Sequence, residues 1–214
     1  MFFEDLSPEH QFIRAARIET AEAFKHRLGT VDINVRTASG TALHQAYSTG
    51  NHEVASLLLG HGTNPYAVND FGLSVLHAAV ATNNASAVRT LLERRAIQGV
   101  DPRINDADPF GRTPLHIAAG MGNYDMCKTL LGFGASPKSL DASGYPPIYH
   151  AAANGKWQVH GLLLAVYPDG SKIAPAGAKN AADLAPDRSA AKRTTGDSTP
   201  DRRMPPSLRM QGRQ

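Results

Sequence analysis

Short apolar clusters with helical spacing recur along this chain, and they are of two alternating kinds. The first kind is rich in alanine, as at Ala118 and Ala119. The second kind places larger apolar residues three to five positions apart, as at Met126, Leu130 and Leu131. Apolar residues that recur at such intervals line one face of an amphipathic helix. The pattern therefore predicts a series of short helix pairs.

Four full pairs align by the apolar positions of their second helices. These positions are Val54, Leu57 and Leu58; Val88, Leu91 and Leu92; Met126, Leu130 and Leu131; and Val159, Leu162 and Leu163. Between the two helices of a pair stands Gly50, Gly122 or Gly155, or in one pair Asn83. Glycine and asparagine are the residues that best tolerate the left-handed conformation that ends many helices.

The pairs return with a nearly constant period. His44 and His77 are 33 residues apart, His116 and Tyr149 are also 33 apart, and His77 and His116 are 39 apart. A fixed period of this size indicates a repeat architecture, in which each unit buries its apolar face only against its neighbours.

The start of each first helix carries a motif that is most complete at residues 113–116, T-P-L-H, followed by Ala118 and Ala119. It recurs as S-V-L-H at 74–77, as T-A-L-H at 41–44 and as P-P-I-Y at 146–149. At these residues the chain resembles the ankyrin-repeat family, over about residues 10–185. The resemblance implies an all-α helix-turn-helix solenoid with short β-like hairpins between repeats. It also implies a structural histidine that bonds the capping threonine and nearby backbone.

Three regions follow from the pattern. Residues 1–35 form an N-terminal capping unit, and residues 36–185 hold four full repeats and a partial C-terminal unit whose first helix is predicted over residues 177–185. Residues 186–214 contain no aromatic residue, isoleucine or valine and are predicted to be a disordered basic tail. The apolar positions assigned to the two helices of the capping unit are Phe12, Ala15, Ala16 and Ile18, then Ala21, Phe24 and Leu28.

Two departures from the period change the picture. The second repeat is six residues too long, with the excess within residues 94–106. Insertions in solenoids lengthen loops on one face, which is often the face that binds partners; a tolerated longer connection is the alternative. In the fourth repeat, Pro146 and Tyr149 replace the capping threonine and the histidine, which predicts a weaker helix start.

The positive charge of the chain belongs to its C-terminal segment. Residues 186–214 carry seven Lys or Arg and three Asp, a net charge of +4 against +3 for the whole chain. Seven cations are enough for weak nonspecific contact with nucleic acid. Because no aromatic residue lies between them for base stacking, a solvated tail is the favoured interpretation. A nucleic-acid-associated protein that uses this tail is kept as an alternative.

Several classes of function lack their signatures. No P-loop, G-x-S-x-G or H-E-x-x-H motif is present, so we expect no catalytic residue, cofactor or metal and hence no enzyme. The single Cys127 is expected to be a buried structural thiol, and no apolar run is long enough to span a bilayer. The first residues lack a secretory signal. We therefore expect a cytoplasmic monomer; a secreted effector-type regulator that recruits a host protein is a further alternative.

The remaining candidate is a binding surface. The resemblance implies that partners contact the hairpin tips and the exposed side of the first helices, which together form a concave face. From the positions transferred by register, the partner-binding residues selected are Asp70, Phe71, Leu73, Phe110, Arg112, Met121, Tyr145 and Asn154. A contiguous set of exposed apolar groups is typical of an interaction site, whereas aromatic tips can instead pack against the next hairpin. We predict a non-enzymatic module that binds a protein partner through this face.

Overall fold

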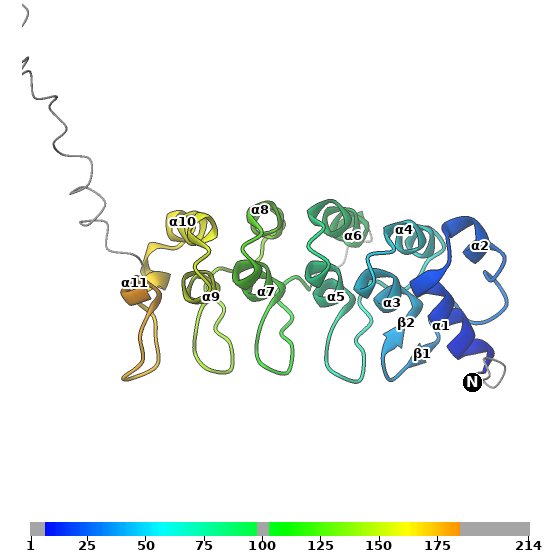
Figure 1. The fold of residues 1–214 in the computed structure, drawn as a ribbon, viewed down its shortest axis with the longest axis horizontal. Helices are drawn as coiled ribbons and strands as arrows, with labels where there is room; N and C mark the ends of the chain where they lie inside the picture. Colours follow the sequence, from blue (N-terminus) through cyan, green and yellow to red (C-terminus); the bar gives the residue numbers. More distant parts are fainter. Residues whose placement is uncertain (1–6, 98–102, 185–214) are drawn as a thin grey trace, which may run out of the picture. The chain divides into compact units, whose positions relative to one another are not determined.

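The computed structural model describes residues 7–97 and 103–184 of the 214-residue chain. Within these residues the helices lie in two layers, with loops that project from one layer away from the other (Figure 1). The inner layer, which carries the loops, comprises α1 (Pro8–Ile18), α3 (Ala42–Ser48), α5 (Val75–Ala81), α7 (Pro114–Met121), α9 (Pro147–Ala153) and α11 (Ala181–Leu184). The outer layer comprises α2 (Ala21–Lys25), α4 (His52–Gly60), α6 (Ala85–Ile97), α8 (Tyr124–Gly132) and α10 (Trp157–Val166).

The loops before the inner helices are the predicted hairpins. In the first of them, strand β1 (Arg36–Thr37) pairs antiparallel with β2 (Gly40–Thr41), with Thr37 opposite Gly40. In the next hairpin a single antiparallel bridge joins Val68 and Ser74. The fold is therefore the predicted helix-turn-helix solenoid with short β-like hairpins.

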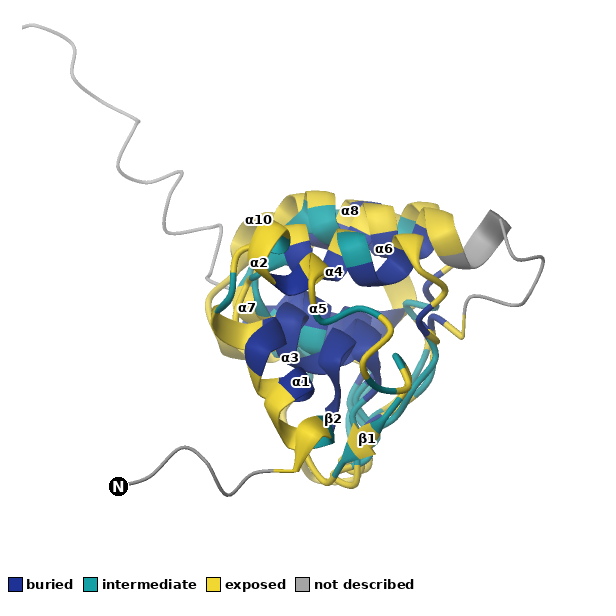
Figure 2. Cartoon of the chain, turned by 90° about the vertical axis from the view of Figure 1, so that its right-hand side faces the viewer, coloured by how far each residue is buried: buried dark blue, intermediate teal, exposed yellow. Residues whose placement is uncertain are grey.

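The core lies between the two layers, where the buried residues form a continuous band (Figure 2). Leu43, Leu76 and Leu115 of the inner helices are fully buried, and so are Leu58 and Leu92 of the outer helices. Full burial of a leucine stabilises the fold by about 1.5–3 kcal/mol. Each repeat therefore depends on its neighbours for the apolar contacts that fold it.

The helix ends follow the sequence prediction. Gly122 ends α7 with φ 79°, and Asn83 takes the same left-handed conformation after α5 with φ 60°. At the start of α9, Pro146 provides no side-chain hydrogen bond to the helix, as expected of the substituted motif.

The two ends of the solenoid differ from the prediction in detail. Ile18 belongs to α1 but is 73% exposed, and Leu28 lies beyond α2, which ends at Lys25. At the other end the partial unit has a shorter helix than residues 177–185, because α11 begins only at Ala181. Its start is fixed by a local cap, in which the amide of Asp183 donates to Oδ1 of Asn180 at 3.0 Å.

Two segments depart from the regular pattern of helix pairs. Part of the excess length in the second repeat extends α6, which has 13 residues against 9 in α4 and α8. The rest of that insertion includes residues 98–102, outside the described part of the chain. After α10 the chain forms a 3₁₀ helix, η1 (Pro168–Lys172), which the sequence pattern did not predict. The predicted tail, residues 186–214, also lies outside the described residues.

Candidate functional site

A histidine in each of three inner helices joins its repeat to the next hairpin. In α7, Nδ1 of His116 accepts a hydrogen bond from the amide of Thr113 at 3.0 Å, and Nε2 donates to the carbonyl of Tyr145 at 3.1 Å. This assignment of the ring proton follows from the hydrogen-bond partners. Burial lowers the pKa of His116 to about 4, so the ring is neutral near pH 7. The ring is structural, as the resemblance implied.

The same arrangement recurs one and two repeats earlier. Nε2 of His44 lies 3.2 Å from the carbonyl oxygen of Leu73, and Nε2 of His77 lies 3.2 Å from that of Arg112. Burial lowers the pKa of both rings, that of His44 to about 4. These contacts fix the backbone of three of the predicted partner-binding positions.

Each of the three hairpins that precede α5, α7 and α9 is closed by one Asn or Asp side chain. Oδ1 of Asp108 accepts hydrogen bonds from the amides of Phe110 and Arg112, both at 2.9 Å. Asn69 and Asp141 make the equivalent bonds in the hairpins on either side. The sequence analysis missed these residues, although the signal was available: each lies three positions before a glycine in a predicted turn.

Asp108 also orients Arg112. Nε and Nη2 of the guanidinium lie 2.9 and 2.8 Å from Oδ2 of the carboxylate, whose side chain is fully buried. Burial alone would raise the pKa of Asp108, but the hydrogen bonds from Arg112 and the backbone lower it overall. The guanidinium carbon lies 5.0 Å from the centre of the Phe110 ring, within the range of a cation–π contact. Arg112 is therefore held in place while its side chain stays 41% exposed.

Neighbouring hairpins also contact each other through the backbone. The amide of Ala142 donates to the carbonyl of Phe110 at 2.9 Å, and the amide of Asp70 donates to that of Ala38 at 3.1 Å. Gly111 allows the backbone of its hairpin to lie this close to the next one, because a Cβ atom at this position would lie 2.4 Å from the Ala142 nitrogen. The hairpins are thus a stacked, preformed surface.

The structure places the eight predicted partner-binding residues in two groups. Six belong to the hairpins: Asp70, Phe71, Leu73, Phe110, Arg112 and Tyr145. The other two, Met121 and Asn154, lie at the C-terminal ends of inner helices, at the end of α7 and directly after α9. The hairpins precede the N-termini of these helices, so the length of an inner helix separates the two groups. The eight residues therefore do not form one line.

Within the hairpins, five of the six predicted residues occupy two rows, and the sixth, Asp70, forms an ion pair with Arg36 of the preceding hairpin. Phe71 and Phe110 hold equivalent outer positions and are 64% and 67% exposed. Leu73, Arg112 and Tyr145 hold the inner position, two residues further along, and all three are half-buried. The Tyr145 ring stacks on Tyr149 with 3.8 Å between ring centres, so its contacts are largely within its own repeat. The two phenylalanines are the most exposed apolar groups of the hairpins described.

A cavity of about 370 Å³ lies on the same face, lined by residues of three consecutive repeats. Leu73 and Arg112 line it, together with residues that the sequence analysis did not select: Gln45, Ser48, Asn69, Ala78, Ala81 and Ile117. The hollow forms over the second repeat because Ala78 is short where the flanking repeats have Gln45 and Ile117. Preformed hollows with an apolar lining and few polar groups are typical of ligand sites.

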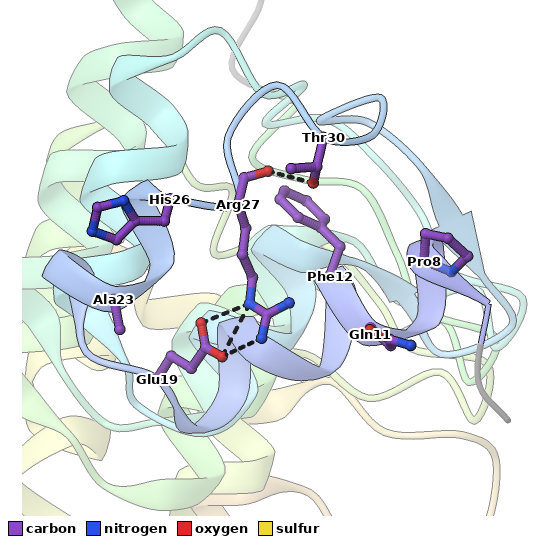
Figure 3. Close-up of a pocket in the computed structure, with 8 residues that line it drawn as sticks. All are labelled: Pro8, Gln11, Phe12, Glu19, Ala23, His26, Arg27 and Thr30. Atoms are coloured by element: carbon purple, nitrogen blue, oxygen red, sulfur yellow. Dashed lines mark hydrogen bonds and ion pairs between the residues drawn. The ribbon is translucent and has the colours of Figure 1, made fainter. Parts of the chain in front are cut away.

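A second cavity, of about 440 Å³, lies in the N-terminal unit (Figure 3). Its charged groups satisfy each other, since Arg27 donates three hydrogen bonds of 2.7–3.0 Å to the carboxylate of Glu19. None of the predicted partner-binding residues lines it.

A metal-binding cluster and a membrane-spanning helix are both absent from the described residues. Within residues 7–97 and 103–184, no three His, Cys, Asp or Glu side chains are grouped so that they could hold a metal ion. In the same part of the chain, every helix is too short or too polar to cross a membrane. Burial raises the pKa of Cys127 to about 12, which leaves its thiol protonated and unreactive near neutral pH.

The stacked helix pairs, the hairpins and the capping histidines together define a helical-repeat protein. A family profile described as ankyrin repeats (3 copies) matches residues 12–106 and 94–173, and the chain belongs to the ankyrin-repeat family. Ankyrin repeats are in general protein-interaction modules without catalytic activity of their own.

Several curated proteins are similar over their repeats. An ankyrin repeat protein of fowlpox virus is 36% identical over 122 residues, which are 57% of this chain and 26% of that protein. The 26S proteasome regulatory subunit p28 of Saccharomyces cerevisiae is 32% identical over 130 residues, 59% of this chain and 54% of that subunit. The mouse homologue of B-cell lymphoma 3 protein is 29% identical over 140 residues, 64% and 31% of the two chains. The chain thus spans about a quarter to a half of these relatives.

Proposed function

We propose that this protein is a non-enzymatic module that binds a protein partner across its concave face, the surface formed by the hairpins and the exposed side of the inner helices. The observation that carries the proposal is the presence of Phe71 and Phe110, each about two-thirds exposed, beside a preformed cavity. Exposed apolar side chains that lie together on one face are typical of interaction sites.

The eight residues contribute unequally in this proposal. Phe71, Leu73, Phe110 and Arg112 form its centre, because they combine exposed apolar area with a fixed cation. Asp70, Met121, Tyr145 and Asn154 are taken to act as margin contacts. Because Asp108 and the neighbouring hairpins already hold this surface in place, little ordering is needed on binding, and this favours affinity.

Phe71→Asp combined with Phe110→Asp tests the proposal. Both side chains are exposed, so we expect helical content and thermal melting to stay close to those of the unaltered chain, while partners captured from a native lysate are lost. Trp157→Asp with Val166→Asp, at the two ends of outer helix α10, introduces the same charge at residues 40% and 51% exposed and serves as the control. Equal capture by the two double variants would refute the proposal.

The setting of this function is also a proposal. The chain is taken to act in the cytoplasm as a monomer, with no cofactor. Sedimentation of the full chain at micromolar concentration gives the mass of one copy if this is correct, and fluorescence of a tagged chain in cells gives its location.

A further inference from the structure

We propose that the cavity on the concave face receives an aliphatic side chain from an extended acidic segment of the partner, and that Arg112 binds a carboxylate of that segment. This inference rests on the proposed function and adds the chemistry of what is recognised.

The size and lining of the cavity select the side chain. Its volume of about 370 Å³ is near the lower limit of ligand pockets, roughly 300–1,000 Å³. Ala78 and Ala81 leave the space open, and Leu73 and Ile117 supply larger apolar groups beside them. A space of this size suits one or two aliphatic side chains and is too small for a helix.

The charge of the lining indicates that the residues beside that aliphatic side chain in the partner segment are acidic. Among the described residues that line the cavity, Arg112 alone is ionised near pH 7, because burial lowers the pKa of both histidines in the lining, His44 and His77. The hairpin-closing residue in the lining is the neutral Asn69, whereas the next two hairpins have Asp108 and Asp141 at the equivalent position. An acidic segment is therefore favoured over a basic one.

Arg112 retains donors for such a carboxylate. Its Nε and Nη2 bond Asp108, while Nη1 makes no hydrogen bond within the described residues. A guanidinium carries five N–H donors, and charge-assisted bonds to carboxylate are among the stronger hydrogen bonds in proteins. The contact with the Phe110 ring fixes the guanidinium, so it is already oriented before a partner arrives.

The rim of the cavity can also bond an extended backbone. Gln45 lines the cavity and donates through Nε2 to the carbonyl of Ser39 at 3.0 Å, which leaves its Oε1 as a group that can accept hydrogen bonds. Asn69 uses Oδ1 for two hairpin amides, and its Nδ2 bonds no other described residue. One acceptor and one donor on adjacent repeats match the N–H and C=O groups of an extended peptide.

The test uses the full chain and a phage-displayed library of random linear peptides as the probe. We expect enrichment of sequences in which an aliphatic residue lies within two positions of Asp or Glu. A selected peptide, labelled for fluorescence anisotropy, should bind at least about tenfold more weakly to Arg112→Gln and to Ala81→Leu, which fills the cavity. Ala153→Leu is the matched control, because Ala153 ends α9 as Ala81 ends α5 but lies outside the cavity.

The outcomes separate this inference from the proposed function. Enriched peptides without acidic residues, no enrichment at all, or equal binding to Ala81→Leu and Ala153→Leu would each overturn the cavity proposal. If lysate partners are still lost with Phe71→Asp and Phe110→Asp in those cases, the concave face remains the binding surface. Ala81→Leu leaves Asp108 and its partners intact, so its result stands even if Arg112→Gln lowers the melting temperature.

Discussion

Nε2 of His116 lies 3.1 Å from the main-chain carbonyl oxygen of Tyr145, 29 residues further along the chain. One ring thereby joins the start of α7 to the hairpin that precedes α9. Because His44 and His77 make the same link to Leu73 and Arg112, the surface that we propose to bind partners is attached to the core at three successive points.

Replacement of His116 by alanine should destabilise the fold by about 2–4 kcal/mol, because two hydrogen bonds are lost and the buried amide of Thr113 loses a partner. Urea unfolding followed by circular dichroism measures the loss. His26→Ala, at an exposed position, should change stability by less than about 0.5 kcal/mol. A similar small effect at both positions would show that the ring does not couple the repeats.

Stability should fall in mild acid. The pKa values of His44 and His116 are lowered from 6.5 to about 4, so between these values the unfolded chain binds more protons than the folded chain. The stabilisation by these two neutral histidines is fully present above pH 6.5 and is lost as the pH falls toward 4. At pH 5 the free energy of unfolding is lower by on the order of 2 kcal/mol per histidine. Urea midpoints at pH 7 and pH 5 measure the change. If the double variant His44→Gln, His116→Gln keeps the full pH dependence, other groups cause it.

Gly111→Ala should be more destabilising than Gly134→Ala. Both glycines have positive φ, 74° and 91°, so alanine at either position costs about 1–2 kcal/mol. Only at Gly111 would the added Cβ also collide with the backbone of Ala142, and nothing lies within 4 Å of it at Gly134. We expect an additional loss of about 1–3 kcal/mol at Gly111 in thermal or urea unfolding. Equal losses would mean that the hairpins are not stacked as described.

Cys127 should report global unfolding. Its thiol is fully buried, and burial raises its pKa to about 12, so an aromatic disulfide reagent should react slowly at pH 7. In increasing urea the labelled fraction should follow the loss of helix signal. Fast labelling of the native chain would contradict the packing of α8 against its neighbours.

The sequence was sufficient for the fold because each repeat encodes its own helix starts and stops. The signals that determine the helices act over only a few residues, so they can be recognised within a single repeat. These signals are the T-P-L-H motif, the left-handed residues Gly122 and Asn83, and the apolar spacing. The prediction was less accurate for the two terminal units, because the exposure of Ile18 and the late start of α11 depend on what packs beside them.

The candidate site could be predicted only in part, because it also depends on which residues of other repeats lie beside it. Exposure of Phe71 and Phe110 follows from hairpin register. The cavity does not, because it arises from the contrast between the short Ala78 and the longer Gln45 and Ile117 on the two flanking repeats. Such combinations appear only when repeats are set side by side.

Site-specific photo-crosslinking tests the central claim most directly. A benzophenone amino acid replaces Phe71 or Phe110 on the concave face in one set of chains, and Trp157 or Val166 of α10 in the other, and each chain is irradiated in cells. The account predicts a crosslinked protein of the same mass from positions 71 and 110 and none from positions 157 and 166. Crosslinks from α10 alone would contradict it and move the binding surface to the outer layer.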